Sequence, residues 1–193
     1  MKKRKLLWDL LPAMLLWLML SVFLWGWIFT FLTDTEPENK LTLFVDAAVP
    51  DDTGLAVRLE ETLKGGPIRM VKVHPFTYAM LSGEQLRTSD AYIVRASHVE
   101  EYREWFAPLP AGLAEGAAQE SLLLLEGVPF GLRVYDAAAG EGILAQYIDY
   151  HDPALPQEDH YLLLGSGSLH LTANPGGADD LAVSLAETLL ALP

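Results

Sequence analysis

The feature that most constrains this chain is an uncharged segment near its N-terminus. No charged residue occurs from Leu10 to Leu32, a run of 23 residues. A helix of about 20 apolar residues spans the hydrocarbon core of a bilayer. The run follows four consecutive basic residues, Lys2 to Lys5, and such clusters favour the cytoplasmic side of a membrane. The sequence therefore predicts a single transmembrane helix over residues 10–32, with residues 1–9 in the cytoplasm.

A cleaved signal peptide is the alternative interpretation of this segment. The apolar core of a signal peptide is shorter, about 7–15 residues, and small residues mark its cleavage site. The run here is longer, and residues 29–39 contain no Ala-x-Ala-like site. We therefore expect an uncleaved anchor in the cell membrane, a linker over residues 33–40, and an extracellular domain over residues 41–193.

The part of the chain beyond this segment is strongly acidic. Residues 34–193 hold nine Lys or Arg against 25 Asp or Glu, so their formal net charge is −16. Such a surface repels nucleic-acid phosphates and anionic lipid headgroups, and we expect neither as a partner. The chain also contains no Cys, which excludes disulfides, thiol catalysis and Cys-ligated zinc within it. About 160 residues suffice for one compact domain.

Apolar segments alternate with segments of helical character along this domain. Apolar runs predict strands within residues 40–49, 68–76, 90–97, 121–127, 131–136 and 159–168. Helical spacing and end signals predict helices within residues 51–67, 78–90, 97–110 and 174–193. Capping boxes are expected at Ser82 with Gln85 and at Ser97 with Glu100. Residues 108–120 are expected to form a loop with some helix.

This alternation predicts the fold class. The strand segments are apolar throughout rather than alternating, which is typical of strands covered on both faces. Strands that alternate with helices favour a parallel sheet. We therefore predict an α/β domain with an open, largely parallel, doubly wound sheet, in which residues 121–127 and 131–136 form a hairpin or adjacent strands.

The segment Gly165-Ser166-Gly167-Ser168 follows an apolar strand and raises the question of a phosphate-binding loop. Such a loop needs a helix that starts directly after the glycines and aims its backbone N–H groups at the anion. Residues 169–177 are not helix-like and contain no Lys. We interpret the segment as the end of a strand followed by a turn.

Polar residues at the predicted strand ends suggest a ligand site. In open α/β sheets, ligands bind beyond the carboxyl ends of the strands, where the strand order reverses. Asp46, His74 and Arg95, together with Ser97, follow the first three strands. With a strand order of 2-1-3 they would line one crevice, and Asp46 could pair with Arg95. The alternative is that strand ends are polar because they reach the surface there.

Other constellations give weaker signals for chemistry. Carboxylates and imidazoles that could bind a divalent metal gather in one stretch, at Asp149, His151, Asp152, Glu158, Asp159 and His160. The spacing matches neither HExxH nor a calcium loop. His98 and His170 are isolated along the chain, and Ser166 and Ser168 lack the GxSxG context of a hydrolase nucleophile. We therefore expect no catalytic residues, no metal and no cofactor.

Three segments resemble extracellular solute-binding proteins of bacterial ABC transporters. Residues 159–192 are similar to a tyrosine-containing strand, a Ser/His-Leu turn and a closing helix of that family. Residues 126–136 resemble its strand ending in Tyr-Asp, and residues 90–102 resemble a strand that ends at the cleft and enters a helix. Solute-binding proteins have two lobes, whereas this domain has the length of one. The resemblance implies a single binding-protein-like lobe at the outer face of the membrane.

These observations favour a non-enzymatic, membrane-anchored domain that contacts another membrane or envelope protein, such as a transporter. The alternative is a small-molecule binding protein that uses the crevice at the strand ends. A weaker alternative is an envelope enzyme that holds a metal within residues 149–160.

Overall fold

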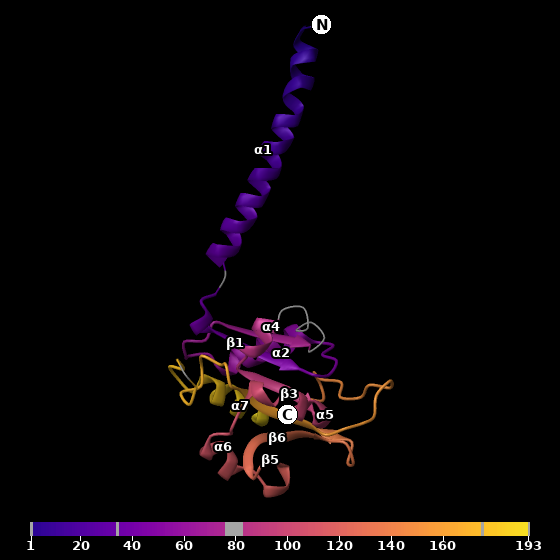
Figure 1. Cartoon of the computed structure of the whole chain (residues 1–193), viewed down its shortest axis with the longest axis vertical. Coiled ribbons are helices and arrows are strands. Elements are labelled where there is room, and N and C mark those ends of the chain that lie inside the picture. Colours follow the sequence, from indigo (N-terminus) through magenta and orange to yellow (C-terminus); the bar gives the residue numbers. More distant parts are fainter. Residues whose placement is uncertain (1, 34, 76–82, 175, 193) are drawn as a thin grey trace. The chain divides into compact units, whose positions relative to one another are not determined.

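The computed structural model describes residues 2–33, 35–75, 83–174 and 176–192. The chain divides into two compact units, Met1–Glu36 and Pro37–Pro193. The first consists mainly of one helix, α1 (Lys2–Thr33), which carries Pro12 in its N-terminal part (Figure 1). Within it, Leu11–Phe29 have a mean hydropathy of 1.9. The predicted N-terminal helix is confirmed, and its length and composition suffice to cross a membrane.

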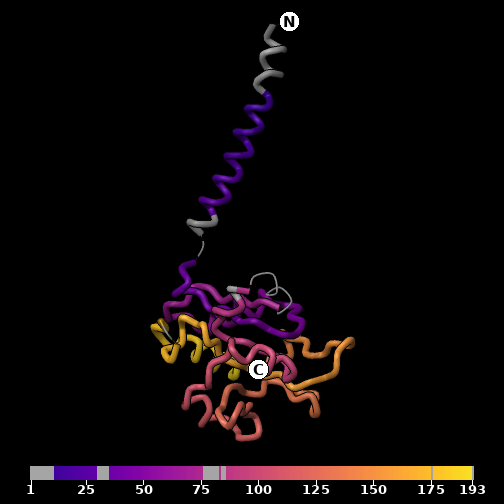
Figure 2. Tube along the Cα trace, viewed as in Figure 1, coloured from indigo at the N-terminus to yellow at the C-terminus, as the bar shows by residue number. Residues whose placement is uncertain are grey.

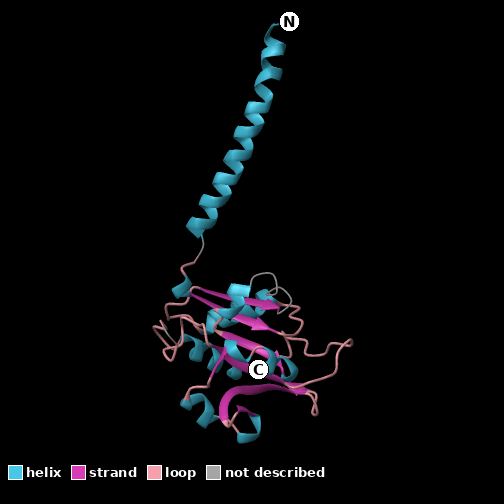
Figure 3. Cartoon of the chain, viewed as in Figure 1, coloured by secondary structure: helices cyan, strands magenta, loops and turns pink. Residues whose placement is uncertain are grey.

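The second unit is an α/β domain built around one mixed sheet (Figures 1 and 3). Its main strand order is β2-β1-β3-β8-β6-β5, with β4 paired to β8 and β7 paired to β6. The elements, in chain order, are η1 (Pro37–Asn39), β1 (Lys40–Val45), α2 (Asp52–Thr62), β2 (Met70–Pro75), α4 (Gly83–Arg87), β3 (Ala91–Arg95), α5 (Ala96–Glu101), η2 (Arg103–Trp105), β4 (Phe106–Ala107), α6 (Ala111–Gly116), η3 (Gln119–Ser121), β5 (Leu122–Leu125), β6 (Val128–Asp136), β7 (Glu141–Gly142), β8 (His160–Gly165) and α7 (Leu181–Ala191).

The sheet is open and mostly parallel by strand direction, as predicted, although most of its strand pairings are antiparallel. Strands β2, β1 and β3 pair in parallel, in the order 2-1-3. The other described pairings, from β3–β8 to β5–β6, are antiparallel, so five of the eight strands run in one direction. The β5–β6 hairpin turns through Glu126 and Gly127, both with positive φ, as a two-residue hairpin turn requires.

Strand β8 shows why the sequence could not indicate which strands run antiparallel to the others. Leu162 and Leu164 enter the apolar cluster on one face of the sheet, and Leu163 enters the cluster on the other. A strand covered on both faces is apolar throughout, whichever way its neighbours run. The direction of β8 therefore leaves no mark in its hydrophobic pattern.

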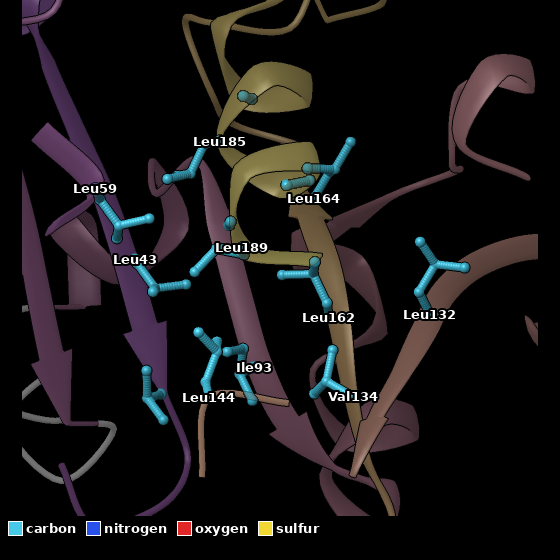
Figure 4. Close-up of a cluster of buried hydrophobic side chains, with 14 of the residues drawn as sticks. Leu43, Leu59, Ile93, Leu132, Val134, Leu144, Leu162, Leu164, Leu185 and Leu189 are labelled. Carbon is cyan, nitrogen blue, oxygen red and sulfur yellow. The ribbon is translucent and has the colours of Figure 1, made fainter. Parts of the chain in front are cut away.

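The larger core lies between the sheet and the helices α2 and α7 (Figure 4). Leu59 on α2 and Leu185 and Leu189 on α7 are fully buried and face Leu43 and Ile93 of the sheet. The two helices come from distant parts of the sequence and pack against each other (Figure 2). Burying such Leu side chains stabilises the fold by roughly 1.5–3 kcal/mol each.

A smaller aromatic core covers the opposite face of the sheet. Phe44 stacks on Tyr92 there at a centroid distance of 6.3 Å, and Phe106 meets Tyr92 edge to face at 5.3 Å. Leu86 on α4 and Val99 on α5 complete the cluster. The sheet is therefore covered by helices on both faces, as predicted.

The helix ends follow the predictions only in part. Asp51 caps α2, since its side chain accepts a hydrogen bond from the Gly54 N–H at 2.8 Å. The expected capping box at Ser97 is absent: α5 begins at Ala96, and the Ser97 N–H donates to Glu158 instead. The predicted 97–110 helix is also wrong beyond Glu101, because the chain passes into η2 and the short strand β4. The other expected box includes Ser82, which lies outside the described residues.

Gly165, the last residue of β8, and Gly167 just after it serve close packing. A Cβ on Gly165 would collide with the Ser89 carbonyl oxygen, and one on Gly167 with the Arg87 carbonyl oxygen. The next described helix begins only at Leu181. The interpretation as a strand end and turn is confirmed, and this turn lies against the segment that leads into β3.

We expect Gly165→Ala to destabilise the protein by about 1–3 kcal/mol, because the added methyl group meets backbone atoms. Gly112→Ala is the matched control: no atom lies within 4 Å of its added Cβ. Ala in place of this helical glycine should stabilise by about 0.5–1 kcal/mol. Urea unfolding of both variants measures the effects, and equal behaviour of the two would contradict this packing role.

Candidate functional site

A cleft of about 940 Å³ opens at the carboxyl ends of β1 and β3. Asp46 directly follows β1, and Arg95 is the last residue of β3. Because these strands are parallel neighbours, their ends bring the two side chains together. The cleft is lined by Asp46, Ala47, Ala48, Val49, Pro75, Arg95, His98, Glu101, Tyr102, Asp149, Tyr150, His151, Asp152, Pro153 and Leu155.

The Asp46 carboxylate organises the inner end of the cleft. Its Oδ2 atom accepts from Arg95 Nε at 3.2 Å and from the Arg95 backbone N–H at 3.4 Å. The same oxygen lies 2.5 Å from His98 Nδ1. A carboxylate can only accept, so Nδ1 carries the hydrogen of this contact. Both Asp46 and Arg95 are only 8% exposed, so their pairing offsets the cost of burying each charge.

The Arg95 guanidinium is only partly used by this pairing. Nε contacts Asp46, while Nη1 and Nη2 make no hydrogen bond or ion pair with any residue that the structure describes. Among the described residues, the one fully buried side-chain polar atom without a hydrogen-bond partner is Trp105 Nε1. Nη1 and Nη2 of Arg95 are therefore not fully buried. Since Arg95 lines the cleft, these N–H groups are accessible to a ligand, and Asp46 fixes their orientation.

Aromatic rings form a wall beside this pair. The His160 ring lies 5.0 Å from the Tyr150 ring and 5.7 Å from the Tyr135 ring, in edge arrangements. Its Nε2 approaches the Asp46 carbonyl oxygen at 3.3 Å. Burial, above all, lowers the pKa of His160 below its usual value. Burial also raises the pKa of Tyr150, which keeps its hydroxyl protonated.

The outer part of the cleft carries exposed carboxylates. Glu101, Asp149 and Asp152 line it together with the apolar surface of Leu155. Asp149 accepts from the His151 N–H at 3.0 Å, and Asp152 accepts from a backbone N–H two residues further on. These local hydrogen bonds shape the 149–155 loop. The cleft thus combines one oriented guanidinium inside with negative charge at its opening.

The predicted site residues separate into two groups. The expected Asp46–Arg95 pair is present, and both residues line the cleft. His74 lies on the opposite face of the sheet, 5.2 Å from the Phe44 ring, because it follows Val73 in the alternation of β2. Ser97 uses its backbone N–H to bind Glu158 and does not line the cleft. A ligand role for all four residues remains a prediction.

Two histidine contacts were not predicted from the sequence, that of His98 in the cleft and that of His170 in the second polar cluster described below. Both histidines were regarded as isolated, yet His98 contacts Asp46 and His170 contacts Asp90. These carboxylates lie 52 and 80 residues away in the sequence. The available signal for His98 was its position three residues after Arg95, at the start of a helix.

Asp90, Ser168 and His170 form a second polar cluster, which is buried. Asp90 Oδ1 accepts from Ser168 Oγ at 2.5 Å and lies 3.0 Å from His170 Nδ1. His170 Nε2 lies 3.1 Å from the Glu38 carbonyl oxygen. In a hydrolase triad the imidazole stands between Ser and Asp, whereas here the carboxylate stands in the middle. The cluster holds the segments before β1 and after β8 against β3.

The acidic and histidine-rich stretch does not assemble into a metal site. No group of three or more His, Asp or Glu side chains suited to a metal ion occurs among the residues that the structure describes. Asp159 instead lies 3.5 Å from Arg133 and accepts from the Ala137 N–H.

Comparison with protein-family models and with curated protein sequences finds no match. The resemblance to solute-binding proteins therefore rests on the three sequence segments alone. Fold and cleft together define a mixed α/β domain with an N-terminal apolar helix and an open crevice at its strand ends.

The His170 contacts predict a pH dependence of stability. Both ring nitrogens face acceptors, and the hydrogen bond with Asp90, above all, raises the pKa of His170 above 6.5. The folded state thus holds a proton that the unfolded state releases, so this stabilisation is complete below pH 6.5 and is lost as pH rises through the raised pKa. We expect His170→Gln to destabilise more at pH 5.5 than at pH 9.

Urea unfolding of wild type and variant at both pH values measures this difference. The variant must be compared with wild type at each pH, because other histidines also make the stability depend on pH. Burial lowers the pKa of His74 and of His160, and their contribution to stability therefore rises with pH, opposite to that of His170. His151→Gln, at an exposed position, is the control and should have the same small effect at either pH. An effect of His170→Gln that is independent of pH would show that the ring is not charged in the folded protein.

Proposed function

We propose that this protein is a membrane-anchored binding domain that holds a small polar solute in the Asp46–Arg95 cleft and releases it unchanged. The observation that carries the proposal is the state of Arg95. Its guanidinium is oriented by Asp46 through Nε, and its terminal N–H groups remain available to the cleft. Such a preorganised fork suits a carboxylate, because it binds two oxygens at once with little loss of side-chain entropy.

The remaining lining supports a solute with two kinds of polar group. Tyr102, Tyr150 and Leu155 offer apolar surface to a carbon skeleton, as small-molecule sites generally do. Glu101 and Asp152 place negative charge at the opening, where it favours a cationic group. A zwitterion, such as an amino acid or a short peptide, fits both the inner guanidinium and the outer carboxylates.

The fold offers further support for a binding role. Helix α2 covers one face of the sheet and α4 the other, around strands in the order β2-β1-β3. This arrangement agrees with a doubly wound half-domain, in which the crevice at the strand ends is the usual ligand site. The proposal includes a cytoplasmic N-terminus and an extracellular domain, as the basic residues before the apolar helix favour.

A second candidate function is docking to another membrane or envelope protein, for example a transporter. The supporting observation is the hairpin β5–β6 at the edge of the sheet. Leu124 and Val128 on this hairpin are 51% and 43% exposed, and β5 ends the main strand order. Edge strands with apolar side chains are ready templates for contact with another chain.

The solute proposal is tested by thermal unfolding of the full chain in a non-ionic detergent with amino acids, short peptides, small carboxylates and sugars. A ligand at 100 times its Kd should stabilise the fold by about 2.7 kcal/mol. We expect Arg95→Lys to weaken binding of the responding ligand at least tenfold, because Lys keeps the charge and loses the fork.

Arg133→Lys is the matched control, since Arg133 also pairs with carboxylates but lies outside the cleft. It should leave binding unchanged. A flat screen on folded wild-type protein, or equal loss in both variants, would count against the cleft. Photo-crosslinking from Leu124 in native membranes, with the exposed Val57 as control position, would then decide the docking alternative.

The proposed topology has a direct test because the chain contains no Cys. Ala139→Cys, in an exposed turn, should react in intact cells with a maleimide that cannot cross the membrane, and Lys5→Cys should react only after lysis. The reverse labelling pattern would place the domain in the cytoplasm, and labelling of secreted protein lacking α1 would indicate cleavage.

A further inference from the structure

A second pocket, of about 260 Å³, lies on the β1–β2 half of the sheet, on the face that also carries Phe44. It is smaller than the cleft and runs along this face from Lys40, at the start of β1, to His74, near the end of β2. Its walls are formed by Pro37, Lys40, Thr42, Lys72, His74, Thr88, Asp90, Leu169 and His170.

Two lysines give this pocket a charge unlike that of the rest of the domain. Lys40 and Lys72 lie on adjacent strands, since Thr42 of β1 pairs with Lys72 of β2. Both are half-buried, and neither makes a salt bridge with a described residue. Two ammonium groups without an ion pair among the described residues are unexpected in one small pocket of a domain with only nine Lys or Arg.

The one described carboxylate in the pocket does not neutralise the lysines. Asp90 Oδ2 accepts from the Thr42 N–H at 2.7 Å, and Oδ1 is engaged by Ser168 and His170. Its charge is therefore already balanced by its own donors. The field of the lysines reaches further into the pocket, because they reinforce the effect of burial in lowering the pKa of His74.

We propose that this pocket binds a phosphate group, supplied in the membrane by the headgroup of an anionic phospholipid. Lysine ammonium groups bind phosphate as point charges, and the Thr42 side chain adds a hydroxyl donor. A volume of about 260 Å³ is large enough for one headgroup phosphate with its glycerol.

The covalent chain supports a lipid as the source of the phosphate. Lys40 follows the last residue of α1, Thr33, by seven positions. Seven residues span at most about 25 Å even when fully extended. If α1 crosses a bilayer, the first lysine of the pocket is therefore tethered close to the headgroup layer, whereas a soluble phosphate has no such advantage in local concentration.

This site is compatible with the overall negative charge. The net charge of −16 opposes general adsorption of the domain to an anionic surface. Charges beyond a Debye length, about 8 Å at physiological salt, are largely screened. Binding in the pocket is then decided by the charges close to it. The two lysines can therefore attract a single headgroup, although the surface of the domain as a whole repels an anionic membrane.

The test uses the full chain in non-ionic micelles that contain equal amounts of phosphatidylglycerol and phosphatidylcholine, with native mass spectrometry to count retained lipids. We expect Lys40→Gln/Lys72→Gln to retain one phosphatidylglycerol fewer than wild type. The control Arg58→Gln/Lys64→Gln removes the same charge from the α2 region outside the pocket and should match wild type. Lipid bound at Lys2–Lys5 is common to all three proteins and cancels.

A second arm separates the two sources of phosphate. Calorimetry with inorganic phosphate and with glycerol phosphate should show affinities at least tenfold weaker than that for short-chain phosphatidylglycerol. Tighter binding of free phosphate without preference for phosphatidylglycerol over phosphatidylcholine would support the phosphate site and reject the lipid. Lys72→Arg should preserve binding, which guards against misfolding of the double variant. Equal lipid retention by the pocket and control variants would overturn the proposal.

Discussion

Burial of β3 and of the carboxyl-terminal half of β1 on both faces is the constraint on which the rest of this domain depends. Leu43 and Ile93 face the helices α2 and α7, while Phe44 and Tyr92 face the aromatic core. With both faces apolar, polar side chains can be placed only at the ends of these strands, or at cost within them. The cleft at the carboxyl ends of β1 and β3 follows from this geometry, because parallel pairing delivers both ends to the same edge.

A buried carboxylate stands at each end of this strand pair, and each recruits an imidazole. Asp46 follows β1 and contacts His98, whereas Asp90 precedes β3 and contacts His170. Both carboxylates are stabilised in the same way, because a buried carboxylate needs hydrogen-bond donors. The two residues nevertheless have different roles. Asp90 is enclosed by its own donors and ties segments together, while Asp46 orients an Arg95 whose remaining N–H groups face a cleft.

The sequence predicted those elements whose pattern is local. The strand around Leu43 and the helix around Leu59 were recognised from their apolar runs and capping signals, and both are present. The direction of β8 was not predictable, because burial on both faces erases the alternation. At the cleft, Asp46 and Arg95 were predicted from their strand ends. His98 was missed because its contact with Asp46 spans 52 residues, although its position three residues after Arg95 hinted at the same site.

The charge of the domain illustrates the same limit of sequence reasoning. The net charge describes the electrostatic potential of the domain at long distance. A ligand in a pocket is affected mainly by charged groups within a Debye length of it. Strand β1 has Lys40 at its start and Asp46 just beyond its end, and a six-residue strand measures roughly 17–20 Å. Lys40 and the Asp46 carboxylate therefore lie more than a Debye length apart along β1. The two sites nevertheless meet on β2, because the adjacent residues His74 and Pro75 line the basic pocket and the cleft, respectively.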